Sequence, residues 1–142
     1  MTDWQTLATE SHYQTAVAIK NALDEGKTQE ARRGIEELID ALARADRRAL
    51  RSQLTRLMAH IFKCYTQPHN RSHGWIATIE NAREEIWAIQ EDTPSLTDAV
   101  LMSLWPYCLR AARRDAQGDM NQPVTRDDLT WEEVFDAVYT LE

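Results

Sequence analysis

The sequence is poor in glycine, proline and cysteine, and each shortage excludes a class of fold. Four glycines and four prolines in 142 residues are too few for the many tight turns of an all-β protein. Two cysteines, Cys64 and Cys108, supply neither a disulfide framework nor a C-x-x-C motif. Because Ala, Leu, Arg, Glu and Gln are abundant instead, and these residues favour helices, we expect an all-α fold.

Long apolar runs are also missing. No stretch approaches the roughly 20 apolar residues of a membrane-spanning helix. The first residues show neither the basic nor the apolar region of a signal peptide. We therefore expect no membrane association, and we expect the reducing cytoplasm as the location.

Apolar residues recur at helical spacing in five to six segments of the chain. We interpret Asp46 as an N-cap that separates two helices, and Gly118 as the end of a later one. Pro106 must either kink that later helix or begin a new one. The pattern predicts a single antiparallel helical bundle, one domain over residues 1–142, with helices at about 10–24, 28–43, 47–66, 72–92, 96–117 and 130–139.

The second of these helices carries a clear set of apolar residues at helical spacing. Its members follow one another at steps of three and four residues, which places them on one face of a helix. We expect this face to lie in the core of the bundle. The set consists of Ala31, Ile35, Leu38, Ile39 and Leu42.

The formal net charge of −7 is unevenly distributed. Residues 44–71 carry 7 basic and 1 acidic side chains, whereas the segments on either side are acidic. Arginines within this basic segment form a candidate nucleic-acid contact, because such binding needs clustered cations on one face. These arginines are Arg44, Arg48, Arg51 and Arg56.

An alternative interpretation is that the basic side chains pair with acidic neighbours. Glu80, Glu84 and Glu91 fall on one stripe of the following helix, which could lie opposite. We favour this pairing over nucleic-acid binding, because the overall acidity of the chain repels nucleic acid.

Four potential metal ligands lie close together in the sequence: His60, Cys64, His69 and His73. Their spacing matches no zinc signature, and Cys64 falls near an apolar helix face, where a small buried residue is the usual explanation. We therefore predict no metal site. The chain also lacks a nucleophile elbow, a phosphate-binding loop and a dinucleotide fingerprint, so we expect no cofactor and assign no catalytic residue.

Trp87 lies off the apolar stripe of its helix, close to Ile76 on the helical wheel. Either this helix is buried on two sides, or Ile76 and Trp87 form an exposed apolar patch for a partner. Both interpretations remain open at the level of sequence.

Five segments of the chain form a recognisable set: DRRALRSQLTRLMAHIFKCYTQP, NRSHGWIATIENAREEI, DTPSL, the Tyr107, Ala111 and Arg114 helix, and TWEEVFD. Through these segments most of the chain resembles a bacterial family, common in cyanobacteria, that is known only as domain of unknown function twenty-nine. The resemblance implies an all-helical domain over about 28–139 and no particular activity. The polar residues that match the family pattern are the candidates for a shared site or a structural hydrogen-bond network: His60, Lys63, Gln67 and Arg83.

Amphipathic helices without catalytic motifs favour a protein–protein interaction module, of which a homodimer is the simplest version. Nucleic-acid binding through the basic segment is the alternative hypothesis. An enzyme centred on His60 is a third, with less support.

Overall fold

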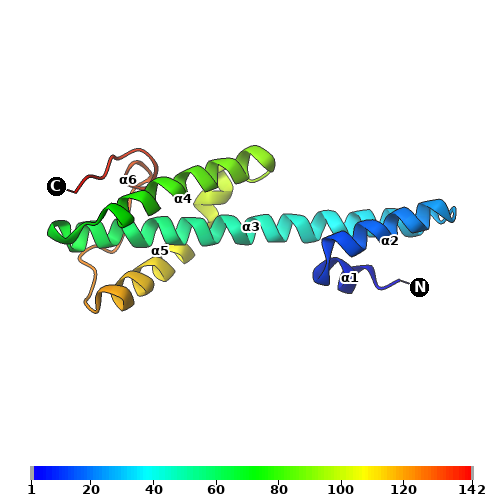
Figure 1. Ribbon diagram of the computed structural model, residues 1–142, viewed down its shortest axis with the longest axis horizontal. Helices are drawn as coiled ribbons and strands as arrows, with labels where there is room; N and C mark the ends of the chain where they lie inside the picture. The colour runs from blue at the N-terminus through cyan, green and yellow to red at the C-terminus, as the bar shows by residue number, and fades with distance from the viewer. Residues whose placement is uncertain (1, 142) are drawn as a thin grey trace. The chain divides into compact units, whose positions relative to one another are not determined.

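The computed structural model describes residues 2–141, and every regular element among them is helical (Figure 1). The predicted all-α fold is confirmed. The elements are α1 (Trp4–Glu10), α2 (His12–Asp24), α3 (Thr28–Thr66), a 3-10 turn (Pro68–Asn70), α4 (His73–Asp92), α5 (Asp98–Met120) and α6 (Trp131–Phe135). They form two compact units, which meet in sequence between Arg47 and Arg48, so that α3 contributes to both.

Several helix boundaries differ from the sequence predictions, and α6, for example, ends at Phe135 and not near position 139. α3 continues through Asp46, because the surrounding residues include no glycine or proline and a capping residue alone does not end a helix. α5 continues past Gly118, and Asn121, with a φ of 54°, ends it in the left-handed conformation. Pro106 lies inside α5 and begins no new helix. Thr130 and Glu133 form a capping box at the start of α6.

The first unit packs α1 and α2 against the beginning of α3 around a small core. The core contains Trp4, Ile19, Ala22 and Ala31. Gly34 makes this packing possible, because a Cβ atom built there would lie 2.7 Å from both the Trp4 ring and Ile19 Cγ1. The Trp4 indole Nε1–H completes the contact by donating to Glu30 Oε2 at 2.9 Å.

The predicted core stripe on this part of α3 is only half correct. Ala31 is buried and Leu38 is partly buried, but Ile35, Ile39 and Leu42 are 42%, 59% and 42% exposed. The face that carries Gly34 and Ala41 is buried instead, because small residues allow the other helices to approach closely. Leu23 of α2 is 52% exposed and lines a hollow of about 380 Å³ together with Ala31 and Ile35. We call the exposed residues Leu23, Ile35, Ile39 and Leu42 the apolar stripe.

The second unit contains a larger core, to which α3, α4, α5, α6 and the segment after α6 all contribute. The fully buried side chains from α3 include Leu50, Leu54, Leu57, Ile61 and Phe62. α5 runs parallel to α3, since Cys108 Sγ approaches the Arg51 carbonyl at 3.6 Å and Lys63 pairs with Asp119. Within residues 2–141, no helix combines the length and the apolar composition that a bilayer span requires.

Candidate functional site

A groove between α3 and α5 brings together residues from two of the predicted sites. It has a volume of about 380 Å³. The α3 wall is formed by Arg51, Ser52, Thr55, Arg56, Ala59 and His60, and the α5 wall by Tyr107, Ala111, Arg114, Asp115 and Asp119. His60 of the candidate polar site therefore lies beside Arg51 and Arg56 of the candidate nucleic-acid contact. The two predictions thus overlap on one side of α3 through these three residues.

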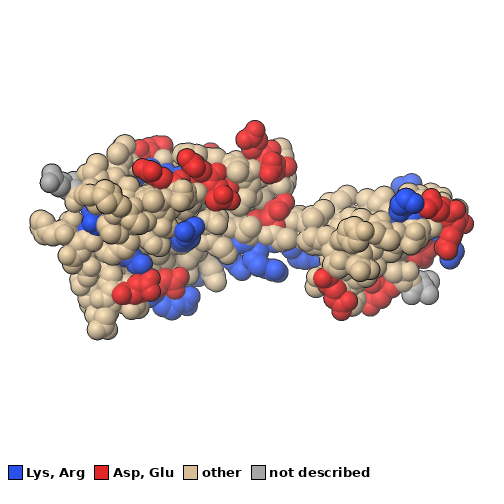
Figure 2. All heavy atoms as spheres, viewed as in Figure 1, with Lys and Arg blue, Asp and Glu red and all other residues tan. Residues whose placement is uncertain are grey.

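The four arginines of the candidate nucleic-acid contact do not pair with acidic neighbours. Among residues 2–141, Arg44, Arg48, Arg51 and Arg56 form no ion pair, and neither do Glu80, Glu84 and Glu91 of α4. The favoured sequence interpretation is therefore wrong for these arginines and for the α4 carboxylates, although Lys63 of the same basic segment does pair, with Asp119 of α5. Arg51 instead stacks on the Tyr107 ring, 5.0 Å from its centroid. Figure 2 shows basic side chains gathered over the middle of α3.

Within the second unit, the groove itself carries Arg51 and Arg56 from α3 and Arg114 from α5. Within residues 2–141, the one ion pair of Arg114 is with its sequence neighbour Asp115, at 3.9 Å. Arg48 is exposed but does not line the groove, and Arg44 belongs to the first unit. Of the four candidate nucleic-acid residues, only Arg51 and Arg56 therefore lie in the groove.

His60 is held in one tautomer at the edge of the groove. Its Nδ1 lies 2.9 Å from the Arg56 carbonyl oxygen, which can only accept, so Nδ1 carries the proton and Nε2 carries the lone pair. Burial lowers the pKa of His60 below its usual value, although the bond to the Arg56 carbonyl acts in the opposite direction. His60 is therefore neutral near pH 7 and offers a hydrogen-bond acceptor.

Lys63, one turn further along α3, is buried and paired. Its Nζ lies 2.7 Å from Asp119 Oδ2 and 5.8 Å from the centroid of the Trp75 ring. The hydrogen bond from Lys63 lowers the pKa of the Asp119 carboxyl. Because Asp119 also lines the groove, Lys63 affects the groove indirectly, by holding this carboxylate in place. Gln67 Nε2 extends the same side of α3 by donating to Gln122 Oε1 at 2.6 Å.

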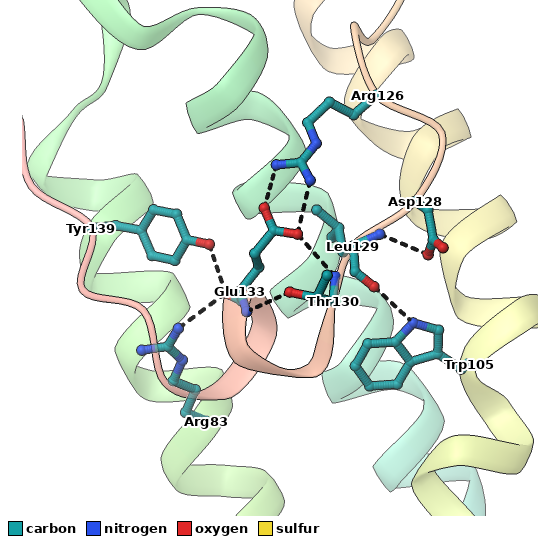
Figure 3. Close-up of polar contacts among 8 residues, drawn as sticks. All are labelled: Arg83, Trp105, Arg126, Asp128, Leu129, Thr130, Glu133 and Tyr139. Carbon is teal, nitrogen blue, oxygen red and sulfur yellow. Dashed lines mark hydrogen bonds and ion pairs between the residues drawn. The ribbon is translucent and has the colours of Figure 1, made fainter.

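Arg83 is the one member of the candidate polar site with partners in a different place (Figure 3). Its Nε donates to the Val134 carbonyl at 2.8 Å, and it lies over the Tyr139 ring at 5.7 Å. The Tyr139 hydroxyl donates to the Glu133 carbonyl at 2.6 Å. Arg83 thus fastens α6 and the segment after it to α4. Sequence reasoning groups Arg83 with His60, Lys63 and Gln67, but the structure places only these three along the α3–α5 side.

The Glu133 side chain lies in the same region and is bound by Arg126. Arg126 binds its carboxylate with two guanidinium nitrogens, one of them Nη2 at 2.8 Å from Oε1, and lies over the Tyr65 ring at 4.4 Å. These bonds lower the pKa of Glu133 to about 2. The contacts of Arg83, Arg126 and Glu133 are explained by the packing of the C-terminal segment.

The remaining predicted residues are placed as follows. Ile76 is partly buried against the core, whereas Trp87 is 49% exposed. Cys64 is fully buried, as its position near an apolar face predicts, and burial raises the pKa of its thiol. His69 and His73 are exposed, and within the described chain no three His, Cys, Asp or Glu side chains are grouped to hold a metal ion.

Sequence reasoning missed the acidic part of the groove. Asp115 and Asp119 lie far along the chain from α3, and no spacing rule connects them to His60 or Lys63. Tyr107, Ala111 and Arg114 are named at the level of sequence only through the family resemblance, and they form the opposite wall.

Comparison with known families agrees with the resemblance seen in the sequence. The model of the family described as Domain of unknown function DUF29 matches residues 13–140. The chain belongs to this family. No curated protein and no solved structure matches the chain. Membership in the DUF29 family is consistent with the helical fold and assigns no activity.

Proposed function

We propose that this DUF29 protein is a protein–protein interaction module whose first unit self-associates through the apolar stripe. The carrying observation is the exposure of Leu23, Ile35, Ile39 and Leu42 on a unit with a very small core of its own. Contiguous exposed apolar side chains are costly in water and usually mark an interaction surface. Covering them enlarges the core of the first unit.

A second copy of the chain is the occupant that fits the charges beside the stripe. Arg32 and Glu36, one turn apart on α3, line the same hollow as Ile35 and Leu23. Within the described residues neither of them forms an ion pair. In a two-fold dimer each contact occurs twice with the roles exchanged, so that Arg32 of each copy can meet Glu36 of the other. A surface that carries both a positive and a negative side chain can be complementary to the same surface on a second copy.

The patch suggested by the sequence at Ile76 and Trp87 is a smaller candidate for the same role. Ile76 packs against the core of the second unit, so Trp87 provides most of the apolar exposure there. One half-exposed side chain is common on protein surfaces and requires no partner.

Sedimentation velocity over a range of protein concentrations tests the proposal. We expect a concentration-dependent dimer for the wild type. Ile39→Glu is expected to weaken dimerisation at least about tenfold, because the introduced charge must be buried in the interface. Val138→Glu, at an apolar residue that is 85% exposed outside the stripe, is the matched control. Trp87→Glu tests the alternative surface. A wild type that stays monomeric at every concentration contradicts self-association.

Nucleic-acid binding is a second candidate, favoured because Arg48, Arg51 and Arg56 of α3 form no ion pair within residues 2–141. Free guanidinium groups are available for phosphate contacts in a way that salt-bridged groups are not. The test is fluorescence anisotropy with a labelled DNA duplex at increasing salt. Binding that weakens steeply with salt and is lost in Arg48→Glu and Arg51→Glu supports this candidate, and unchanged binding in these variants excludes the arginines as the contact.

A further inference from the structure

We propose that the groove between α3 and α5 binds a small phosphate monoester that also carries hydroxyl groups, such as a sugar phosphate. This inference concerns the second unit and does not depend on self-association through the first. It follows from the shape of the groove, from the position of its cations and from the presence of carboxylates among them.

The groove has the size of a small-molecule site. Its volume of about 380 Å³ lies within the range of about 300–1,000 Å³ that is typical of ligand pockets. Ala59 and Ala111 form part of its lining and are 4% and 7% exposed. Small side chains at these two positions leave space between the helices, and Tyr107 closes one wall with an aromatic ring.

The cations of the groove are suited to a single phosphate group. Arg51 and Arg56 form no ion pair within residues 2–141, and Arg114 has only the 3.9 Å contact with the adjacent Asp115. Arginine is the side chain best matched to phosphate, because its planar nitrogens can bind two oxygens at once. Cations from both helices face the groove, so that a phosphate between them can be bound from two sides.

The carboxylates of the groove distinguish a small hydroxylated ligand from a nucleic acid. Asp115 and Asp119 lie on the α5 wall, and the ion pair with Lys63 holds the Asp119 carboxylate there. A carboxylate repels the continuous phosphate chain of a nucleic acid but accepts hydrogen bonds from the hydroxyl groups of a sugar. Ser52, Thr55 and the unprotonated Nε2 of His60 add further polar groups to the lining. A sugar phosphate with its phosphate at the arginines and its hydroxyl groups at the carboxylates contacts both kinds of charged side chain in the groove.

Isothermal titration calorimetry with ribose 5-phosphate tests the assignment. Ribose, inorganic phosphate and a single-stranded DNA 12-mer are the comparison probes. We expect ribose 5-phosphate to bind more tightly than ribose or inorganic phosphate, because only the ester engages both sets of groups.

The decisive variants remove one charge each. Arg56→Gln and Arg114→Gln are expected to weaken ribose 5-phosphate binding about tenfold or more, since each loses a charge-assisted contact. Arg48→Gln, at an exposed arginine that does not line the groove, is the matched control and is expected to leave the affinity unchanged. Circular dichroism of each variant verifies that the helices are retained.

Three results overturn the proposal. The first is no heat of binding for ribose 5-phosphate at millimolar concentration. The second is equal affinity for ribose 5-phosphate and inorganic phosphate, which removes the role of the carboxylates. The third is tighter binding of the DNA 12-mer with equal losses in Arg48→Gln and Arg56→Gln, which assigns the surface to nucleic acid.

Discussion

Lys63 and Asp119 are 56 residues apart in the chain, yet their charged atoms lie 2.7 Å apart, joining α3 to the end of α5. The two partners differ in environment, since the Lys63 side chain is 8% exposed and that of Asp119 is 64% exposed. A buried ammonium group depends on its partner more than an exposed carboxylate does. Removing the Asp119 carboxylate is therefore expected to destabilise the protein more than removing the Lys63 ammonium.

Asp119→Asn is expected to lower the free energy of unfolding by about 1–2 kcal/mol, because the ammonium of Lys63 stays buried without its counter-ion, although nearby solvent moderates the loss. Lys63→Met is expected to cost less, since an apolar side chain of similar length replaces the buried charge. Urea denaturation of both variants measures the difference. A larger loss in Lys63→Met than in Asp119→Asn contradicts this account of the pair.

Gly34 and Gly118 provide a matched pair of glycine-to-alanine substitutions in helices. Gly34→Ala forces a methyl group against the Trp4 ring and Ile19, so we expect a net loss of about 1–2 kcal/mol after the gain in helix propensity. Gly118→Ala meets no atom within 4 Å and is expected to gain up to about 1 kcal/mol. Thermal unfolding followed by circular dichroism compares them. A stabilising Gly34→Ala shows that α1 and α2 do not approach α3 closely.

The contact between Arg126 and Glu133 predicts a dependence of stability on acid pH. The folded pKa of Glu133, about 2, is below its ordinary value of 4.5, so the pair stabilises the fold fully above pH 4.5 and loses this effect as the pH falls towards 2. Glu133→Gln is expected to cost about 1–2 kcal/mol at neutral pH, a difference from wild type that shrinks in acid. Urea denaturation over a pH series measures it, with the exposed Glu132→Gln as the control. A difference independent of pH refutes the assignment.

Tyr139→Phe tests the attachment of the C-terminal segment. The phenylalanine keeps the buried ring beside Tyr65 but loses the hydrogen bond to the Glu133 carbonyl, for an expected loss of about 1 kcal/mol. Hydrogen exchange is expected to increase for the amides of residues 134–139. Tyr13→Phe, at a tyrosine that is 76% exposed, is the control and is expected to change the stability by less than about 0.5 kcal/mol.

The sequence predicts local structure well where the signal is local. Ser and Thr favour the first position of a helix, and Ser72 and Thr130 cap α4 and α6. Leu50, Leu54, Leu57 and Ile61 recur at helical spacing and are all buried. Apolar spacing identifies a face of a helix, but it does not say whether another element covers that face. This is why Ile35, Ile39 and Leu42 follow a core pattern and are nevertheless exposed.

The candidate site is predicted only on one of its two sides. Helical spacing places Arg56, His60, Lys63 and Gln67 along α3, but the residues opposite them come from the far end of α5. Which charged side chains pair also depends on residues that are far apart in the sequence. The carboxylates of α4 have the correct spacing to pair with α3, yet Lys63 pairs with Asp119 of α5, because tertiary packing decides which helix faces which.

The central claim, self-association through the apolar stripe, is tested most directly by a charge exchange measured with sedimentation equilibrium. We predict that Arg32→Glu weakens the dimer, because it places like charges opposite one another at both two-fold related contacts. The double variant Arg32→Glu/Glu36→Arg is predicted to restore the wild-type affinity. A double variant as weak as the single one, or a wild type that is monomeric throughout, contradicts the pairing of Arg32 with Glu36 between two copies.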